Sequence, residues 1–85
     1  MKISFKLFAS LSEFLPAGAL DNQIEIDVPA DATPAWVISH YKVPRELAHL
    51  VLIDGFYVSP DERNTRVLKE HEVLAVFPPV AGGRD

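Results

Sequence analysis

The last segment of the sequence holds the groups best placed to do chemistry on another molecule. After Phe77 the chain reads Pro78-Pro79-Val80-Ala81-Gly82-Gly83, followed by Arg84-Asp85. Two consecutive prolines cannot continue a central strand, so they predict an extended exit from a sheet. The four residues before Arg84 carry no bulky or charged side chain, and their backbone can approach another protein's active site closely. From Phe77 to Gly83 the fully extended reach is about 20 Å.

Taken alone, the Gly82-Gly83 pair is also compatible with an ordinary frayed terminus, because glycine-rich chain ends are common. The histidines are weaker candidates for chemistry. His40, His49 and His71 lack the helical i, i+4 spacing and the nearby carboxylate of a metal site. We interpret them as surface or helix-end histidines, and we expect no metal site.

The acidic pairs are also weak candidates. Asp61-Glu62 and Glu70-His71-Glu72 fall in predicted polar turns, where we interpret them as solvated charges. The sequence contains no glycine-rich phosphate loop, no nucleophile elbow and no zinc-protease motif. We therefore expect neither a bound cofactor nor a free-standing enzyme.

The composition indicates one folded domain and excludes several kinds of site and partner. The chain has 85 residues, of which 48% are hydrophobic and 24% charged, as expected for one folded domain. It has no cysteine, which excludes disulfides, thiolate metal sites and a cysteine nucleophile. The net charge of −4 and the scattered basic residues argue against nucleic acid or an anionic membrane surface as a partner. No apolar run approaches the ~20 residues that span a bilayer, and we expect a cytoplasmic protein.

Two alternating segments open the chain. Residues 2–8 and 23–28 place apolar side chains at every second position, which predicts two half-buried strands that pair as a hairpin. Between them, Ser10–Leu15 is predicted to form a short helical turn, with Ser10 as N-cap and Glu13 completing a capping box.

The middle of the chain predicts a helix and a second hairpin. Thr33 and Pro34 suit an N-cap and a first helical position, and the apolar stripe is Val37, Ile38 and Tyr41. Pro44 is expected to end that helix by Val43. Residues 45–50 are expected to form a second short turn. Asp54-Gly55 joins the apolar runs 50–53 and 56–58 as a hairpin turn. The last strand is predicted over 71–77.

This order of elements indicates an α+β fold of the β-grasp kind. One helix laid across one face of a mixed four- to five-stranded sheet is the smallest arrangement that buries both apolar surfaces. The β-grasp domain is expected over residues 1–78, and a flexible C-terminal tail over 79–85. The periodicity does not give the order of the strands.

In this context the string Phe77-Pro78-Pro79-Val80-Ala81-Gly82-Gly83 resembles the end of the ubiquitin-like sulfur-carrier family. That family includes the small subunit of molybdopterin synthase and the thiamine-biosynthesis carrier. The resemblance extends over nearly the whole chain: the opening strand, the helix that starts at Thr33, the 54–58 hairpin and the 68–77 turn and strand.

The resemblance implies a function for the tail. In such carriers an adenylyltransferase uses ATP to activate the terminal glycine carboxylate, and a sulfur donor converts the acyl-adenylate to a thiocarboxylate. Gly83 would bear the sulfur and Gly82 would be the spacer. The resemblance further implies that the carrier acts with a larger catalytic synthase subunit in molybdopterin biosynthesis. The alternative is a ubiquitin-like modifier or a non-catalytic interaction module.

Two residues depart from the family pattern. Arg84-Asp85 follow Gly83, so its carboxylate is locked in a peptide bond. The resemblance implies that a processing metalloprotease removes these two residues, since some family members carry such an extension. His71 stands where the family more often has glycine in a tight turn, a conformation that histidine tolerates better than most residues.

Alternation also predicts a surface for partners. If Leu74 and Val76 face the core, Ala75 and Phe77 face the other side of the sheet, together with Leu52. We expect these three to form an apolar patch beside the root of the tail, continued by Pro78, Pro79, Val80 and Ala81. Exposed apolar patches often mark protein interfaces.

Overall fold

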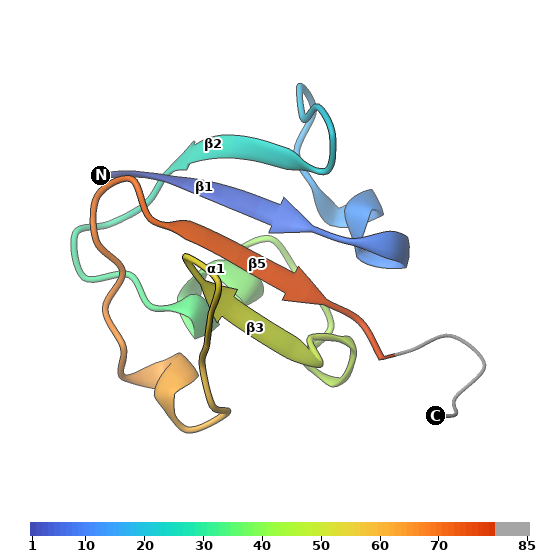
Figure 1. The fold of residues 1–85 in the computed structure, drawn as a ribbon. Helices are drawn as coiled ribbons and strands as arrows, with labels where there is room; N and C mark the ends of the chain where they lie inside the picture. The colour runs from blue at the N-terminus through green and yellow to red at the C-terminus, as the bar shows by residue number, and fades with distance from the viewer. Residues whose placement is uncertain (80–85) are drawn as a thin grey trace.

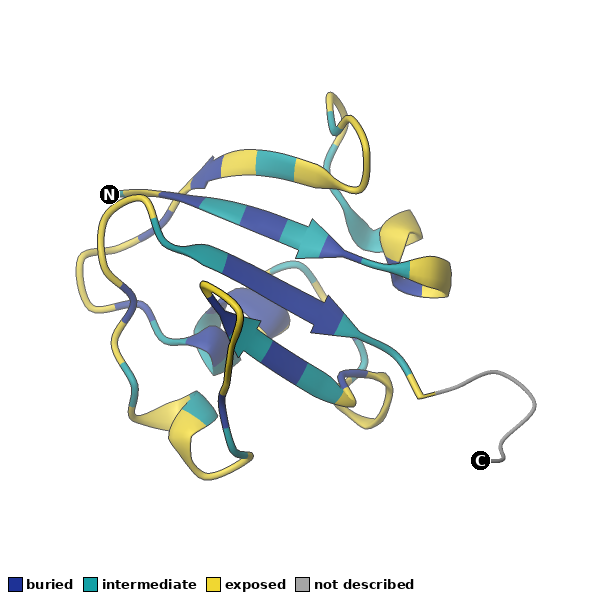
Figure 2. Cartoon of the chain, viewed as in Figure 1, coloured by how far each residue is buried: buried dark blue, intermediate teal, exposed yellow. Residues whose placement is uncertain are grey.

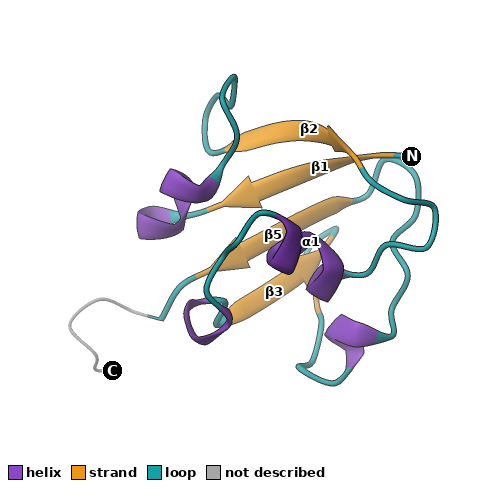
Figure 3. Cartoon of the chain, turned by 180° about the vertical axis from the view of Figure 1, so that it is seen from behind, coloured by secondary structure: helices purple, strands orange, loops and turns teal. Residues whose placement is uncertain are grey.

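The computed structural model describes residues 1–79, and these form one mixed sheet with a short helix on one face (Figures 1 and 3). The strands lie in the order β2-β1-β5-β3-β4. Their bounds are β1 Lys2–Leu7, β2 Gln23–Asp27, β3 Leu50–Ile53, β4 Phe56–Tyr57 and β5 Val73–Phe77. The helix α1 is Pro34–His40, and the 3₁₀ turns are η1 Ala9–Phe14, η2 Arg45–Leu47 and η3 Glu62–Asn64. The β-grasp prediction is confirmed.

The first and last strands lie side by side in the middle of the sheet. β1 pairs with β5 in parallel, and β1 pairs with β2 as the predicted antiparallel hairpin. β3 pairs with both β4 and β5 in antiparallel fashion. As a result β5 starts near the N-terminus and ends at the opposite end of the molecule, where the described chain stops (Figure 1).

The core lies between the sheet and α1. In β1 and β3 every second residue is buried and faces the core, whereas β5 has three buried residues in succession, Leu74 to Val76 (Figure 2). The helix adds Val37 and Ile38 to the core. Residues fully withdrawn from solvent on the central strands are Ile3, Phe5, Leu7, Leu74 and Val76. The alternation in the sequence therefore identified the inner face correctly.

The helix starts as its sequence predicts. The Thr33 hydroxyl accepts a hydrogen bond from the Trp36 N–H at 3.2 Å, and Pro34 occupies the first turn. Because Pro34 has no N–H, it leaves one fewer donor to satisfy there. The helix ends at His40, and Lys42 then adopts a positive φ of 61°. Tyr41, expected on the buried stripe, is half-buried, with its ring against that of Phe5.

The predicted capping box at Ser10 is wrong. The turn η1 starts one residue earlier, after Phe8, and no side chain caps it. The Phe8 N–H instead donates to the carbonyl of Val76, so the sheet holds the chain one residue longer, and Ala9 makes the turn with φ 53°. The hydrogen bond between β1 and β5, and not the capping residues at Ser10, therefore determines where the turn begins.

The last strand is shorter than predicted. It begins at Val73, because His71 adopts φ 67° in a turn and donates its N–H to the Lys2 carbonyl at 2.7 Å. The left-handed conformation expected at His71 is thus confirmed. The Asp54-Gly55 turn is also as predicted, with φ values of 51° and 86°.

The interpretation of Glu72 as a solvated charge is wrong. Its side chain is 12% exposed and forms an ion pair with Arg66 at 2.7 Å, and it accepts a hydrogen bond from the Lys69 N–H. The bond from Arg66 lowers the pKa of the Glu72 carboxyl, and the same bond raises the pKa of Arg66. Glu62 and Glu70 are exposed, yet each accepts a backbone N–H, from Ser59 and Lys2 respectively. In residues 1–79, no helix has the length and apolarity needed to cross a membrane.

Candidate partner-binding surface

The sheet face opposite α1 carries apolar side chains at one end. Leu52 lies opposite Ala75 of β5 and Tyr57 of β4, and Leu50 lies opposite Phe77. Because residues opposite each other on paired strands point to the same side of a sheet, these five share that face. Phe8 joins them by stacking on Phe77. We call these residues the outer patch: Phe8, Leu50, Leu52, Tyr57, Ala75 and Phe77.

The root of the tail is held firmly at the edge of this patch. The rings of Phe8 and Phe77 are stacked, with centroids 4.2 Å apart and planes 2° apart. The Phe77 carbonyl accepts the His49 N–H at 3.0 Å, which ties the end of β5 to the start of β3. Pro78 is half-buried and Pro79 is exposed. The chain therefore leaves the sheet from a fixed point bordered by two aromatic rings.

Ala75 departs from the prediction of an exposed patch. It is only 8% exposed, although it is not part of the core cluster. It lies on the outer face between Leu52 and Lys6, and these longer neighbours flank its single methyl group. Leu52 and Phe77 are on the predicted face and half-buried, and their role in partner binding stays a prediction. Val80, Ala81, Gly82 and Gly83, also predicted at the site, lie outside the described residues.

Sequence reasoning missed Phe8. Its position continues the alternation of the first strand, which already indicates the outer face. What the sequence did not show is that β1 and β5 are parallel neighbours, so that Phe8 and Phe77 meet at the same end. Tyr57, 60% exposed on the edge strand β4, was missed for a similar reason.

The two ends of the outer face differ in their charged side chains. Lys6 lies opposite Ala75 and borders the outer patch. At the far end Lys2 and Asp27 form an exposed ion pair at 3.0 Å, and the bond to Asp27 raises the pKa of Lys2. The outer patch is thus the apolar end, next to the tail root. Over residues 1–79, no cluster of three or more His, Asp or Glu side chains is arranged to hold a metal ion.

Comparison with known proteins now identifies the family. The ThiS family matches residues 5–83, nearly the whole chain. The chain belongs to the ThiS family. The region of this ThiS-family chain that matches the family ends at Gly83. It therefore includes the Gly82-Gly83 pair and excludes Arg84 and Asp85. None of the curated proteins matches the chain.

Solved structures similar to this ThiS-family chain include a small archaeal modifier protein and subunits of molybdopterin-converting factors. SAMP1 from Haloferax volcanii is 26% identical, with 98% of this chain and 100% of that one covered, at a TM-score of 0.66. A putative molybdopterin converting factor, subunit 1, from Pyrococcus furiosus is 30% identical over 93% and 98% of the two chains, at 0.64. The complex of molybdopterin-converting factor subunits 1 and 2 from Helicobacter pylori contains a chain that is 16% identical over 98% and 100%, at 0.60. That last likeness shows the fold alone.

Proposed function

We propose that this chain is a sulfur carrier whose reactive group is the carboxylate of Gly83, exposed when Arg84 and Asp85 are removed. The observation that carries the proposal is the placement of the tail root. Phe77 leaves the sheet at the edge of the outer patch, and the family match continues from there to Gly83. A partner docked on the patch would therefore hold the tail close to its own active site.

The chemistry follows from the weakness of a carboxylate as an electrophile. An adenylyltransferase partner joins the Gly83 carboxylate to the α-phosphorus of ATP, and pyrophosphate leaves. A sulfur donor then attacks the acyl carbon, AMP leaves, and a thiocarboxylate remains. The carrier supplies binding and position, and its partners supply ATP and the catalytic groups. We therefore propose a cytoplasmic carrier subunit that is not itself an enzyme.

A second partner would consume the sulfur. The Helicobacter pylori structure is a complex of subunits 1 and 2 of molybdopterin-converting factor, and the Pyrococcus furiosus protein is named a subunit 1 of such a factor. These names support a larger synthase subunit as the partner of this chain and molybdopterin formation as the pathway. Gly82, with no side chain, would let the arm enter that subunit's active site.

Processing is part of the proposal. The Gly83 carbonyl is bonded to Arg84 in the full sequence, and an amide offers no carboxylate for adenylation. We propose that a metalloprotease removes Arg84-Asp85. Mass spectrometry of the protein isolated from its own cells tests this step. Retention of both residues in every molecule would defeat the carrier proposal.

The decisive experiment uses protein that ends at Gly83. Incubated with an activating enzyme of this family, ATP and a sulfide donor, it should gain the mass that one sulfur adds when it replaces one oxygen. The matched controls are the 85-residue chain and a chain that ends at Gly82. Both should remain unchanged, since the first has no free glycine carboxylate and the second is one residue too short. Equal reaction of all three would show that Gly83 has no special role.

A ubiquitin-like modifier is the second candidate. SAMP1 is a small archaeal modifier protein by name and is 26% identical to this chain. In that role the activated Gly83 would form amide bonds with lysines of other proteins. The same incubation with cell extract separates the two: lysine-linked products favour the modifier, and a thiocarboxylate alone favours the carrier.

A further inference from the structure

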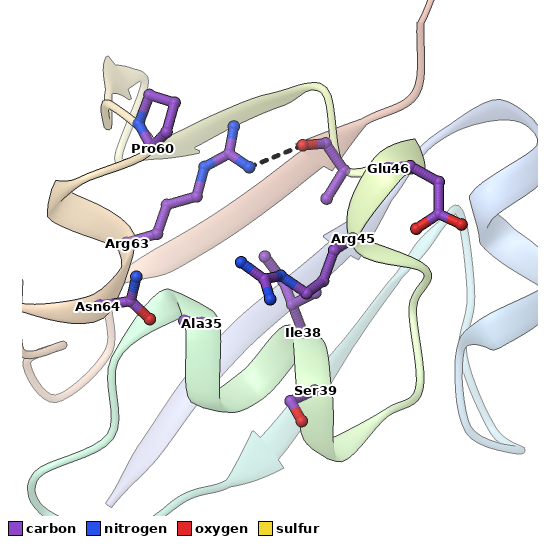
Figure 4. Close-up of a pocket in the computed structure, with 9 residues that line it drawn as sticks. Ala35, Ile38, Ser39, Arg45, Glu46, Pro60, Arg63 and Asn64 are labelled. Carbon is purple, nitrogen blue, oxygen red and sulfur yellow. Dashed lines mark hydrogen bonds between the residues drawn. The ribbon is translucent and has the colours of Figure 1, made fainter.

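A hollow of about 500 Å³ lies on the helix side of the sheet, away from the outer patch. We call it the helix-side pocket. Its walls come from three separate segments: Ala35, Ile38 and Ser39 of α1, Arg45 of η2, and Arg63 and Asn64 of η3 (Figure 4). This volume lies within the range of small-ligand sites, roughly 300–1,000 Å³.

One arginine builds the wall of the pocket. The two terminal nitrogens of Arg63 donate to the carbonyls of Ala48 and His49 at 2.8 and 3.0 Å, so η3 is fastened to the segment that leads into β3. Figure 4 draws the first of these two bonds as a dashed line. The Arg63 Nε is buried and has no hydrogen-bond partner among residues 1–79. The Arg63 guanidinium is therefore held in place by backbone carbonyls, and its positive charge lies next to the pocket.

A second arginine is free to bind. Arg45 is exposed, and within the described chain its guanidinium takes part in no hydrogen bond or ion pair. Figure 4 shows it projecting between α1 and Arg63, while the carboxylate of Glu46 points the other way. Ser39 and Asn64 add a hydroxyl and an amide at the rim. Two arginines against one glutamate leave the pocket positively charged in a chain whose net charge is −4.

We propose that the helix-side pocket binds a carboxylate carried on a short apolar stem, with Arg45 as the ion-pair partner. A planar guanidinium donates two parallel hydrogen bonds to the oxygens of a carboxylate. The apolar surface of Ile38 and Ala35 matches an aliphatic stem, which a phosphate or sulfate lacks. The carboxylate can belong to a free small acid or to a glutamate side chain of another protein, and the experiment below distinguishes them.

The site is independent of the proposed carrier function. It lies on the opposite side of the sheet from the outer patch, so an occupant and a tail-handling partner can bind together. The two sites are nevertheless close, because Arg63 holds the carbonyl of His49 and the N–H of His49 holds the carbonyl of Phe77. The wall of the pocket is thus connected to the tail root through the backbone of His49.

Nuclear magnetic resonance titration with butyrate tests the proposal. At constant ionic strength, butyrate should give saturable shifts of the Arg45 side-chain and the Ser39 and Asn64 resonances. Chloride, which has the charge only, and butyramide, which has the stem only, should give none. Arg45→Gln should weaken butyrate binding about tenfold or more, the loss expected for a charged hydrogen bond. Lys69→Gln removes the same charge from an exposed side chain elsewhere and should leave binding unchanged.

A steric variant keeps the test independent of charge. Ala35→Leu should fill the pocket and abolish the shifts, although Arg45 is retained. Tighter binding of N-acetyl-glutamate amide than of butyrate assigns the pocket to a protein side chain, and the reverse order assigns it to a free acid. The proposal is overturned if butyrate and chloride act alike, or if Arg45→Gln binds butyrate as well as the parent chain.

Discussion

Phe8 and Phe77 stack with their ring planes 2° apart, although 68 residues lie between them in the sequence. The contact joins the end of the first strand to the point where the tail leaves the last one. It is made possible by the parallel pairing of β1 with β5 and by the bond from the Phe8 N–H to the Val76 carbonyl at 3.2 Å. The tail root is therefore positioned by the two central strands of the sheet.

Phe77→Asp should weaken binding of the activating partner about tenfold or more, because it places a charge in the outer patch that we propose as the partner interface. Phe77 is half-buried on the outer face, outside the core cluster, so the fold should survive. Calorimetric titration with the activating enzyme measures the affinity, and circular dichroism checks the fold.

Phe8→Ala is the matched variant for this first prediction. It removes the stacking partner and keeps Phe77, and an aromatic pair contributes about 0.5–1.5 kcal/mol. Its affinity should therefore fall between those of the parent and Phe77→Asp. If Phe77→Asp unfolds the chain, Phe77 belongs to the core instead of to an interface.

Thr33→Ala should lower the free energy of unfolding by about 1 kcal/mol, because it leaves the Trp36 N–H without its acceptor. Urea unfolding followed by the fluorescence of Trp36, the single tryptophan, measures the change. Thr33→Ser keeps the oxygen and should restore most of the loss. An equal loss in both variants would mean that the methyl group of Thr33 matters and the cap does not.

Much of the fold was predictable because its signals are local. Alternation identified the buried side of β1 and β3, the Thr33-Pro34 pair marked the start of α1, and Asp54-Gly55 marked a turn. Each of these depends on residues within one segment. The capping box at Ser10 failed because a distant contact, the bond of Phe8 to Val76, decided where the strand ended.

The candidate site was less predictable because its parts are far apart in the sequence. Nothing near Phe8 indicates that β5 will lie beside it, and nothing near Glu72 indicates the ion pair with Arg66. The helix-side pocket likewise brings together three segments, and its free arginine, Arg45, had no local feature to distinguish it. The covering of Ala75 depends on Leu52 and Lys6, which belong to two different neighbouring strands.

His71→Gly should raise the free energy of unfolding by about 0.5–1 kcal/mol. His71 has φ 67°, a conformation that costs an L-residue about 1–2 kcal/mol and glycine nothing, and the greater freedom of unfolded glycine offsets part of the gain. Urea unfolding measures the difference. Gly55→Ala is the opposite test: its φ is 86° and an added methyl group would meet nothing within 4 Å, so strain alone should destabilise the fold. A destabilised His71→Gly variant would contradict the prediction.

Glu72→Gln should lower the free energy of unfolding at neutral pH by about 1–2 kcal/mol, because it removes the charge that pairs with Arg66. The effect is smaller than for a fully buried ion pair, since solvent screens the partly exposed Arg66. The pKa of Glu72 is lowered in the folded state, chiefly by the bond from Arg66. Its contribution is therefore complete above the ordinary pKa of a glutamate and is lost as the pH falls through the lowered value.

The pH series distinguishes this ion pair from a general effect of charge. The gap in unfolding free energy between the parent and Glu72→Gln should close as the pH falls through that range. Glu13→Gln, at an exposed position in η1, should differ little from the parent at any pH. A gap that stays constant down to acid pH would show that Glu72 acts through packing.

Ala75 and Leu74 offer a final test, since these neighbours in β5 face opposite sides of the sheet. Leu74 is fully buried in the core cluster, so Leu74→Glu should unfold the chain. Ala75→Glu places the same carboxylate on the outer face beside Lys6, where it can reach solvent, and the chain should stay folded with a loss of about 1–2 kcal/mol. The folded variant should nevertheless bind the activating partner about tenfold less tightly, because the charge lies within the outer patch. If folded Ala75→Glu bound the activating partner with unchanged affinity, the outer patch would not be part of the interface. The partner would then contact the tail instead.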